Sequence, residues 1–298
     1  MDTANLKAIQ QVKDYNDIFG APTCHPLVSV VNFSDMPPIR HGRYVYGVYA
    51  LFLKDVDCGE MRYGRQVYDY SEGTVLAIAP GQVAGTVDDG QRHQGHGWAL
   101  IFHPDLIHGT GLLRAMKDYT YFSYEANEAL HLSEDERTVF MDCLHKIQAE
   151  IEGGIDRHTR RLLVANIEVL LDYLQRFYER QFDTRNRVNH DILSRFEDLL
   201  EDYYAPGHSN ELPTVKYFAD HLCLSSNYFG DLVKQATGRT ARDHIQQKLV
   251  DIAKERILLP KSTISGVAYE LGFQYPQHFT RLFKKVTNLT PQQFRRLY

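Results

Sequence analysis

Amide, basic and aromatic side chains gather in two short stretches near the C-terminal end of the chain. The members are Ser226, Asn227, Tyr228 and Lys234 in the first stretch, and Gln274, Tyr275, Gln277, His278, Arg281, Lys284 and Lys285 in the second. Asn and Gln amides can pair with the edge of adenine and an Arg guanidinium with guanine, whereas Lys suits phosphate oxygens. These side chains are therefore candidates for contact with DNA.

The elements that must position these side chains form a repeat. Residues 214–240 and 263–290 align with an offset of 49 up to Leu222 and Leu271, and of 50 from Phe229 and Phe279 onwards. In each copy, apolar residues spaced i, i+4, i+7 indicate a short helix, and a tight break follows before a second apolar stripe. The pattern predicts helix-turn-helix units at about 215–236 and 264–287, whose second helix can lie in a DNA major groove.

Residues typical of helix ends support the same two helix-turn-helix units. Ser225 is a plausible N-cap and Pro276 suits a first helical turn, while Gly238 and Asn288 stand where each unit should end. Two other interpretations stay open. Any pair of short amphipathic helices gives similar periodicity, and solenoid repeats have comparable periods, although they need at least three units and only two are visible.

At these residues the chain resembles the AraC/XylS family of bacterial transcription regulators. The resemblance covers about the last hundred residues and is carried best by Gly272-Phe273, by Phe279 to Lys285 and by Leu289-Thr290-Pro291. It implies two helix-turn-helix units joined by a long helix, here residues 243–258, within a DNA-binding domain at 191–298. It also implies double-stranded DNA as a partner, with recognition helices in successive major-groove segments, and RNA polymerase as a further partner if the protein is an activator.

Two departures from the family pattern stand out. Gly230-Asp231 occupies a place where the family often has Ser-Arg, and an Asp facing phosphates would be repulsive. Asn288 stands where Gly is usual, at a helix end, so we expect only a small loss of stability.

Charge divides unevenly along the chain. Residues 206–298 hold 13 Lys and Arg against 7 Asp and Glu, whereas residues 1–205 hold 20 against 31. A basic segment beside an acidic body is typical of a nucleic-acid-binding module, although many proteins show such asymmetry by chance. The length of 298 residues favours two domains.

The N-terminal part reads as short strands. Residues 27–33, 45–53, 66–70, 74–78, 98–102 and 119–124 are rich in Val, Ile, Tyr and Phe and are separated by turn residues. Residues 72–82 resemble a cupin strand pair. We therefore expect an α+β protein whose residues 1–182 form a cupin-like β-sandwich or barrel with C-terminal helices. Many AraC-type regulators carry such a domain to sense a small molecule, so this one is expected to sense an effector.

Candidate effector-binding residues are few and weakly signalled. Tyr46, Tyr68 and His103 combine apolar surface with a polar tip, which suits a ligand pocket, but half-buried strand tyrosines are equally common. Four histidines, His93, His96, His103 and His108, fall within sixteen positions without the spacing of a cupin metal set. We expect neither a metal site nor a cofactor.

Residues 133–182 turn helical. Ser133 to Glu136 reads as a capping box, Gly153-Gly154 breaks the first helix, and the second is apolar on more than one side. Its second face could pack against a second copy, which predicts a homodimer, or could close a hairpin within one chain. Residues 183–190 are interpreted as the linker.

The cysteines Cys24, Cys58, Cys143 and Cys223 show no C-x-x-C pair, so neither a zinc ribbon nor a disulfide framework is expected. Cys223 falls in the first turn, where a small buried residue would fit. No secretory signal or membrane-spanning run is apparent, which predicts a cytoplasmic protein without a membrane partner.

The sequence thus predicts a non-enzymatic, sequence-specific DNA-binding transcription regulator that responds to a small molecule. Two alternatives remain: a cupin-type enzyme fused to a DNA-binding domain, and a DNA-binding regulator that responds to no effector. No common catalytic motif is present, but that does not exclude other chemistry.

Overall fold

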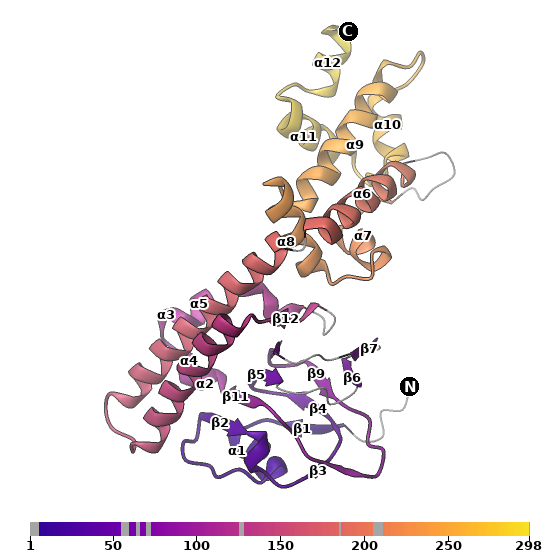
Figure 1. Cartoon of the computed structure of the whole chain (residues 1–298). Helices are drawn as coiled ribbons and strands as arrows, with labels where there is room; N and C mark the ends of the chain where they lie inside the picture. Colours follow the sequence, from indigo (N-terminus) through magenta and orange to yellow (C-terminus); the bar gives the residue numbers. More distant parts are fainter. Residues whose placement is uncertain are drawn as a thin grey trace. The chain divides into compact units, whose positions relative to one another are not determined.

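The computed structural model describes residues 6–54, 60–63, 66–69, 73–124, 128–184, 186–204 and 211–297, with backbone alone for 60–63, 66–69 and 186–188. The chain divides into two compact units between Gln181 and Phe182. Unit 1 combines sheets with helices and unit 2 is helical (Figure 1), so the protein is of the mixed α+β class.

The described strands of unit 1 form two five-stranded sheets and a two-stranded ribbon. The first sheet has the order β1 (Lys7–Ile9), β4 (Arg43–Tyr46), β9 (Val83–Gly85), β6 (Glu60–Tyr63) and β7 (Gln66–Asp69). The second has the order β12 (Leu130–His131), β8 (Thr74–Ile78), β5 (Tyr49–Lys54), β11 (Trp98–Phe102) and β2 (Val28–Asn32). The ribbon pairs β10 (Arg92–His93) with β3 (Ile39–Arg40).

One apolar core joins the two sheets. It includes Ile9 and Ala84 of the first sheet and Ala50, Ile78 and Ile101 of the second, and helix α1 (Val12–Phe19) adds Val12 and Tyr15. The sheets therefore pack around a common interior, as a sandwich requires. Among the described strands, no pairing joins one sheet to the other, so a closed barrel is not formed.

The strand predicted at 45–53 is wrong in one respect, because it divides between the two sheets. β4 belongs to the first sheet and β5 to the second, and Gly47 lies at the crossing. A Cβ at Gly47 would lie 3.2 Å from the carbonyl oxygen of Ile9. The close passage of two backbones thus explains glycine here. Residues 72–82, predicted as a cupin strand pair, contain only β8; the next strand, β9, begins at Val83 and belongs to the other sheet.

The strand predicted at 119–124 is also wrong. Residues Thr120–Ser123 form a 3₁₀ helix, η2. The tyrosine hydroxyls anchor it to a long helix, α5 (Thr159–Thr184): Tyr119 donates to Asp172 at 2.7 Å and Tyr121 to the Leu171 carbonyl at 3.0 Å. Alternating aromatic residues therefore serve helix packing here rather than a pleated strand.

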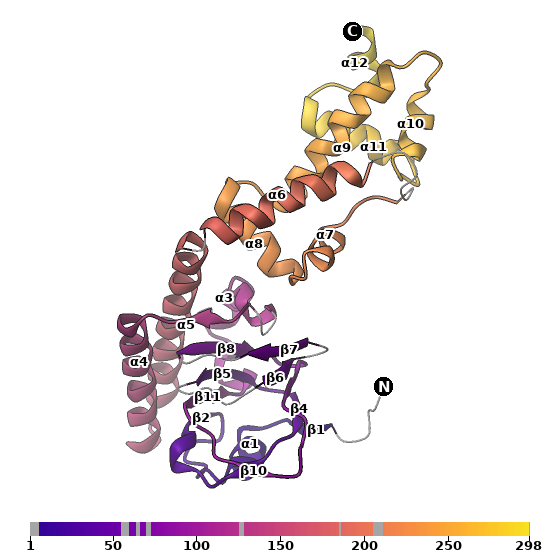
Figure 2. The same cartoon turned by 45° about the vertical axis from the view of Figure 1, so that its right-hand side comes forward.

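Helices α4 (Glu134–Glu152) and α5 lie side by side in unit 1 (Figures 1 and 2). The predicted capping box at Ser133 and Glu136 is confirmed, and Gly153 is the C-cap of α4. α4 packs against β2. Two short helices, α2 (Pro104–Ile107) and α3 (Gly111–Ala115), follow β11. The predicted linker at 183–190 is mainly helical, because α5 reaches Thr184 and α6 begins at Asn186.

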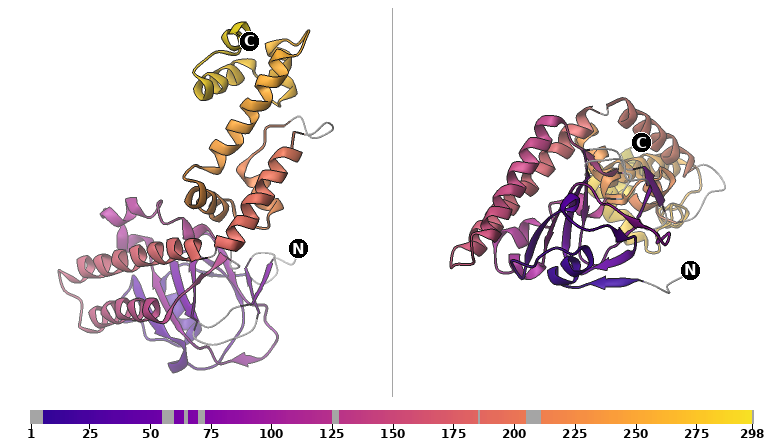
Figure 3. Two further views of the ribbon diagram at one scale, coloured as in Figure 1. Left: turned by 45° about the horizontal axis from the view of Figure 1, so that its top comes forward. Right: turned by 60° about the horizontal axis from the view of Figure 1, so that its bottom comes forward.

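Unit 2 is built around the long helix α9 (Ala241–Leu258). α6 (Asn186–Asp202), α7 (Val215–His221) and α8 (Ser226–Thr237) precede it, and α10 (Ile264–Glu270), α11 (Pro276–Thr287) and α12 (Pro291–Leu297) follow. α9 contacts both the α7–α8 pair and the α10–α11 pair, toward opposite ends (left panel of Figure 3). In the part of the chain that the structure describes, no helix has the length and apolar character needed to cross a membrane.

Candidate DNA-binding surface

The first helix-turn-helix unit consists of α7 and α8. Thr214 caps α7 by accepting from the Tyr217 amide, and Ser225 caps α8 by accepting from the Tyr228 amide at 3.2 Å. Between the helices, Cys223 adopts φ 58°, a left-handed conformation that is rare outside glycine. Cys223 is exposed, so the expectation that this turn residue is buried is wrong.

The buried face of α8 fixes which of its side chains point outwards. Phe229 is fully buried, and its ring lies 5.0 Å from that of Phe196 on α6. Leu232 and Val233 are buried on the same face. Asn227 and Lys234 are exposed, and Ser226 is partly exposed. The N-terminal turn of α8 therefore presents an amide and a hydroxyl, with a lysine about two turns later.

The prediction that Tyr228 contacts DNA is wrong, because the side chain is buried. It is 4 % exposed, and its ring centroid lies 5.0 Å from that of Phe182. The apolar ring is thus used to pack α8 against the segment that leads into α6. A side chain that is buried to this extent is not available for direct contact with a base.

The second unit consists of α10 and α11 and follows the same plan. Thr263 caps α10, Pro276 occupies the first turn of α11, and the turn between them holds Gly272 at φ 91°. Asn288 ends α11 in the left-handed conformation at φ 62°, as Gly238 ends α8 at φ 72°. The predicted helix-end roles of Ser225, Pro276, Gly238 and Asn288 are confirmed.

One apolar cluster holds α11 in place. Phe279 and Phe283 are fully buried against α9 residues Leu249, Val250 and Ala253. All the candidate side chains of this unit are exposed, namely Gln274, Tyr275, Gln277, His278, Arg281, Lys284 and Lys285. The Tyr275 and His278 rings contact each other edge to face at 5.6 Å. The structure thus brings this whole predicted set together on and beside the outer face of α11.

The two outer faces differ in charge. α11 carries Arg281, Lys284 and Lys285 and no acidic residue, whereas α8 carries Lys234 and Asp231. Lys285 lies 3.5 Å from the Gln246 amide oxygen on α9. Among the described residues, no ion pair neutralises Arg281 or Lys284. Exposed, unneutralised cations on one helix face attract phosphates.

Not every basic residue of unit 2 belongs to this surface. Arg295 on α12 donates from Nε to the Ile257 carbonyl at 2.9 Å and from Nη2 to Ser262 Oγ at 2.9 Å. It therefore fastens α12 to the end of α9. Lys248 is likewise engaged, 2.5 Å from Glu201 of α6. The sequence alone does not show which basic residues bind within the protein, as Arg295 and Lys248 do, and which are exposed.

The structure describes the side chains of two of the three effector candidates of unit 1, and it places them in different surroundings. Tyr46 is 4 % exposed within the core between the sheets, where burial and the neighbouring Tyr44 raise its pKa. His103 stands at the start of α2, where its Nδ1 accepts from the Asp105 amide at 3.1 Å. Tyr68 belongs to β7, whose side chains lie outside the described residues. Of the two side chains that are described, that of Tyr46 is buried and that of His103 is partly exposed.

The four clustered histidines also separate. His96 Nδ1 lies 3.4 Å from Ser34 Oγ, while His93 lies beside Asp89 and His41. His41 and Asp89 were not predicted from the sequence, because the proximity of His41 to His93 depends on the pairing of β10 with β3. In the described residues, the His41, Asp89 and His93 group alone has the proximity needed to share a metal ion.

Unit 2 is similar in sequence to known helix-turn-helix proteins. The family model described as "Helix-turn-helix domain" matches residues 218–297. The chain is 36% identical over 142 residues to the transposon Tn10 TetD protein of Escherichia coli, covering 48% of this chain and 91% of TetD. It is 39% identical over 96 residues to an HTH-type transcriptional regulator of Pseudoalteromonas carrageenovora, covering 26% of this chain and 57% of that protein.

A solved structure gives a similar match. The C-terminal domain of the two-component response regulator yesN from Fusobacterium nucleatum is 25% identical with a TM-score of 0.32, covering 35% of this chain and 98% of that one. The chain spans less than two thirds of the length of several curated relatives, including 28% of YesN of Bacillus subtilis. The repeated helix-turn-helix architecture and the match along TetD assign the chain to a family: it belongs to the AraC/XylS family of transcription regulators.

Proposed function

We propose that this protein is a sequence-specific DNA-binding transcription regulator that places α8 and α11 in two successive major-groove segments. The carrying observation is the repetition, on both sides of α9, of a capped helix with a buried aromatic face and an exposed polar face. α9 has 18 residues, which corresponds to about 27 Å at 1.5 Å per residue. That span is comparable to the separation of roughly 34 Å between neighbouring major-groove segments.

The two units are proposed to contribute differently. Arg281, Lys284 and Lys285 make the second unit the stronger electrostatic anchor, with Gln274, Gln277 and His278 as further donors. Asn227, supported by Ser226, gives the first unit an amide suited to adenine, and Lys234 suits a phosphate. Tyr275, exposed beside His278, completes the proposed contact set.

Unit 1 is proposed to be a cupin-like sandwich that senses a small molecule between its sheets. Tyr15 supports this location, because it is fully buried and its hydroxyl has no hydrogen-bond partner among the described residues. An unpaired buried hydroxyl is costly, and a polar ligand group would satisfy it. Tyr46 lies in the same core. An effector would alter DNA occupancy only by binding one state of the protein better than another.

A homodimer is proposed to form through α5. Leu162 and Val169 are seven residues apart on this helix, two turns, and are 46 % and 47 % exposed. Apolar side chains at this spacing share one helix face and suit a matching face on a second copy. We expect Leu162→Glu with Val169→Glu to reduce the mass by light scattering to that of a monomer. Leu113→Glu, at a residue 38 % exposed on α3, is the matched control.

Genome-wide footprinting of the full chain on fragmented DNA from its own source tests the function. We expect discrete protected sites that share a sequence pattern, and loss of those sites when Gln277 and Arg281 are both changed to Ala. Protection without any shared pattern would contradict sequence-specific regulation. Footprints that no small molecule alters would favour the regulator without an effector, and turnover of a small molecule by unit 1 would favour the fused enzyme.

A further inference from the structure

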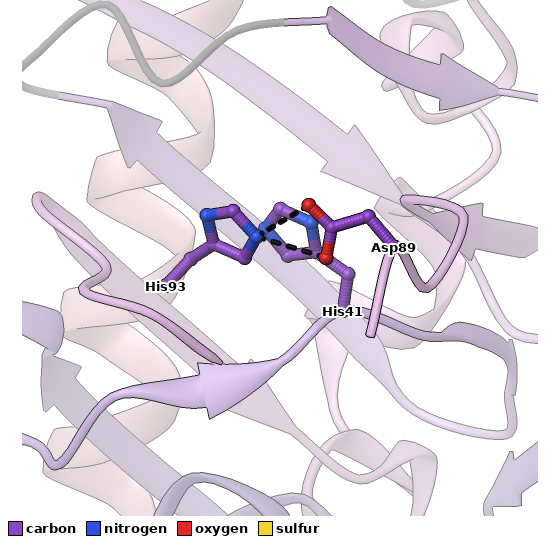
Figure 4. Close-up of side chains that lie close together, drawn as sticks. All are labelled: His41, Asp89 and His93. Atoms are coloured by element: carbon purple, nitrogen blue, oxygen red, sulfur yellow. Dashed lines mark hydrogen bonds and ion pairs between the residues drawn. The ribbon is translucent and has the colours of Figure 1, made fainter. Parts of the chain in front are cut away.

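Three side chains from two segments of unit 1 converge at its surface. His93 Nε2 lies 2.8 Å from Asp89 Oδ2, and the His41 and His93 rings stack with centroids 4.0 Å apart (Figure 4). One ligand atom from each of the three residues lies within 4.8 Å of the other two. The convergence is tertiary, because His41 and His93 are 52 positions apart in the sequence.

Backbone pairing holds this group together. β10 pairs antiparallel with β3, and His93 lies opposite Ile39. His41 follows β3 directly, two residues after Ile39, and is therefore a diagonal neighbour of His93. Asp89 sits in the turn before β10, where its carboxylate also accepts from the Gln91 amide at 3.0 Å. The adjacent Asp88 is engaged elsewhere: it accepts from Arg40 Nε at 3.3 Å and from the Gly90 amide. Asp89 is therefore the carboxylate that faces the two rings.

We propose that His41, Asp89 and His93 bind a divalent transition-metal ion, with Zn²⁺ as the representative. Two imidazoles and one carboxylate form a donor set that suits Zn²⁺ and other first-row ions, and it disfavours Mg²⁺ and Ca²⁺, which prefer oxygen ligands. The proposal goes beyond DNA binding and does not depend on it. All three residues are partly or fully exposed, so an ion can enter from solvent and keep water in its remaining positions.

The required movement is small. Zn²⁺ bonds of 2.0–2.1 Å in tetrahedral geometry separate neighbouring ligand atoms by about 3.4 Å. Since the present separations are at most 4.8 Å, no pair of ligand atoms needs to approach by more than about 1.4 Å, and His93 Nε2 and Asp89 Oδ2, now 2.8 Å apart, need to separate by about 0.6 Å. The parallel rings must turn so that their lone pairs converge, and the final torsion of a His side chain is broad enough to allow it. The bound ion would then link the β3–β10 ribbon to the turn that carries Asp89.

Metal titration of the full chain tests the site directly. Equilibrium dialysis against ZnCl₂ with elemental analysis should give one tightly bound ion per wild-type chain. His41→Gln, Asp89→Asn and His93→Gln should each raise the Kd at least about tenfold, because even loss of an outer-sphere partner costs 10–100-fold. His96→Gln is the matched control, since His96 lies three residues from His93 and outside the group.

Cobalt substitution separates this site from binding at the exposed thiols Cys24 and Cys223. The Co²⁺ complex of the wild type should show ligand-field bands without thiolate-to-cobalt charge transfer. Far-UV circular dichroism of each variant should match the wild type, because the altered side chains lie at the surface. Unchanged Zn²⁺ affinity in all three variants, or a thiolate charge-transfer band that accounts for the bound ion, would overturn the proposal.

Discussion

The two helix-turn-helix units share a buried phenylalanine at equivalent positions and differ in the charge of their exposed faces. Phe229 and Phe279 are both fully buried at equivalent positions, yet the outer face of α8 carries one lysine and one aspartate while that of α11 carries three cations. The turn differs as well, with Cys223 at φ 58° in the first unit and Gly272 at φ 91° in the second. The packing of the recognition helix thus depends on the same buried ring in both units, whereas the charge of its exposed face differs between them.

The largest expected effect tests whether the two scaffolds are equally packed. Phe229→Ala and Phe279→Ala should each lower the free energy of unfolding of unit 2 by about 3–5 kcal/mol, because each removes a fully buried ring. Urea denaturation of the full chain measures the loss. Tyr275→Ala, at a residue 54 % exposed, is the control and should change stability by less than about 0.5 kcal/mol. A tolerated Phe229→Ala would show that the first unit is loosely packed.

The next effect concerns base recognition. Arg281→Ala should weaken binding to a specific site by roughly 1–3 kcal/mol and relax the preference at one base position. A set of operators that differ at single base pairs, titrated by fluorescence anisotropy, would measure it. The control is Arg296→Ala, an exposed arginine on α12 outside the proposed contact set. Equal weakening on every sequence would instead make Arg281 a phosphate contact.

A smaller effect distinguishes the two turns. Gly272→Ala should lower the stability of unit 2 by at least about 1 kcal/mol, because a Cβ is strained at φ 91°. Cys223→Gly should raise stability by less than about 1 kcal/mol, because relief of the left-handed strain is partly offset by the greater freedom of glycine in the unfolded chain. Thermal unfolding of both variants would measure the changes. A marked loss of stability in Cys223→Gly would show that the Cys223 side chain has a packing role.

The finest comparison concerns phosphate binding. Lys284→Ala should reduce the slope of log K against log salt by about 0.9 for each phosphate that is left without its cation, and Lys285→Ala by a similar amount. Lys234→Ala should reduce the slope by at most about 0.9, because α8 presents a single lysine. Binding measured from low to moderate salt gives the slope. An unchanged slope in Lys284→Ala would show that this residue does not bind a phosphate.

The sequence was most informative where local patterns dominate. The four helix-end roles at Ser225, Gly238, Pro276 and Asn288 follow from short-range hydrogen bonding and backbone conformation, and all four are found in the structure. It was less informative where tertiary packing decides. Tyr228 has a polar tip and lies on the side of α8 predicted to be exposed, yet Phe182 buries its ring.

Unit 1 shows the same limit more strongly. The crossing at Gly47 and the helical turn at 120–123 depend on partners that are distant in sequence. Strand propensity alone therefore predicted one continuous strand at 45–53 and a strand at 119–124, and both predictions were wrong. The group of His41, Asp89 and His93 likewise requires the β3–β10 pairing, which spacing along the chain does not reveal. Alternation of apolar residues does not specify which sheet a strand joins.

The most direct test of the division between the two units is to map the base positions relaxed by Asn227→Ala and by Arg281→Ala on one operator. We expect two separate positions, an adenine for Asn227 and a guanine for Arg281, about 10 base pairs apart, because α8 and α11 are proposed to occupy successive turns of the major groove. Relaxation of the same position by both variants, or uniform weakening by both without any change of preference, would contradict it.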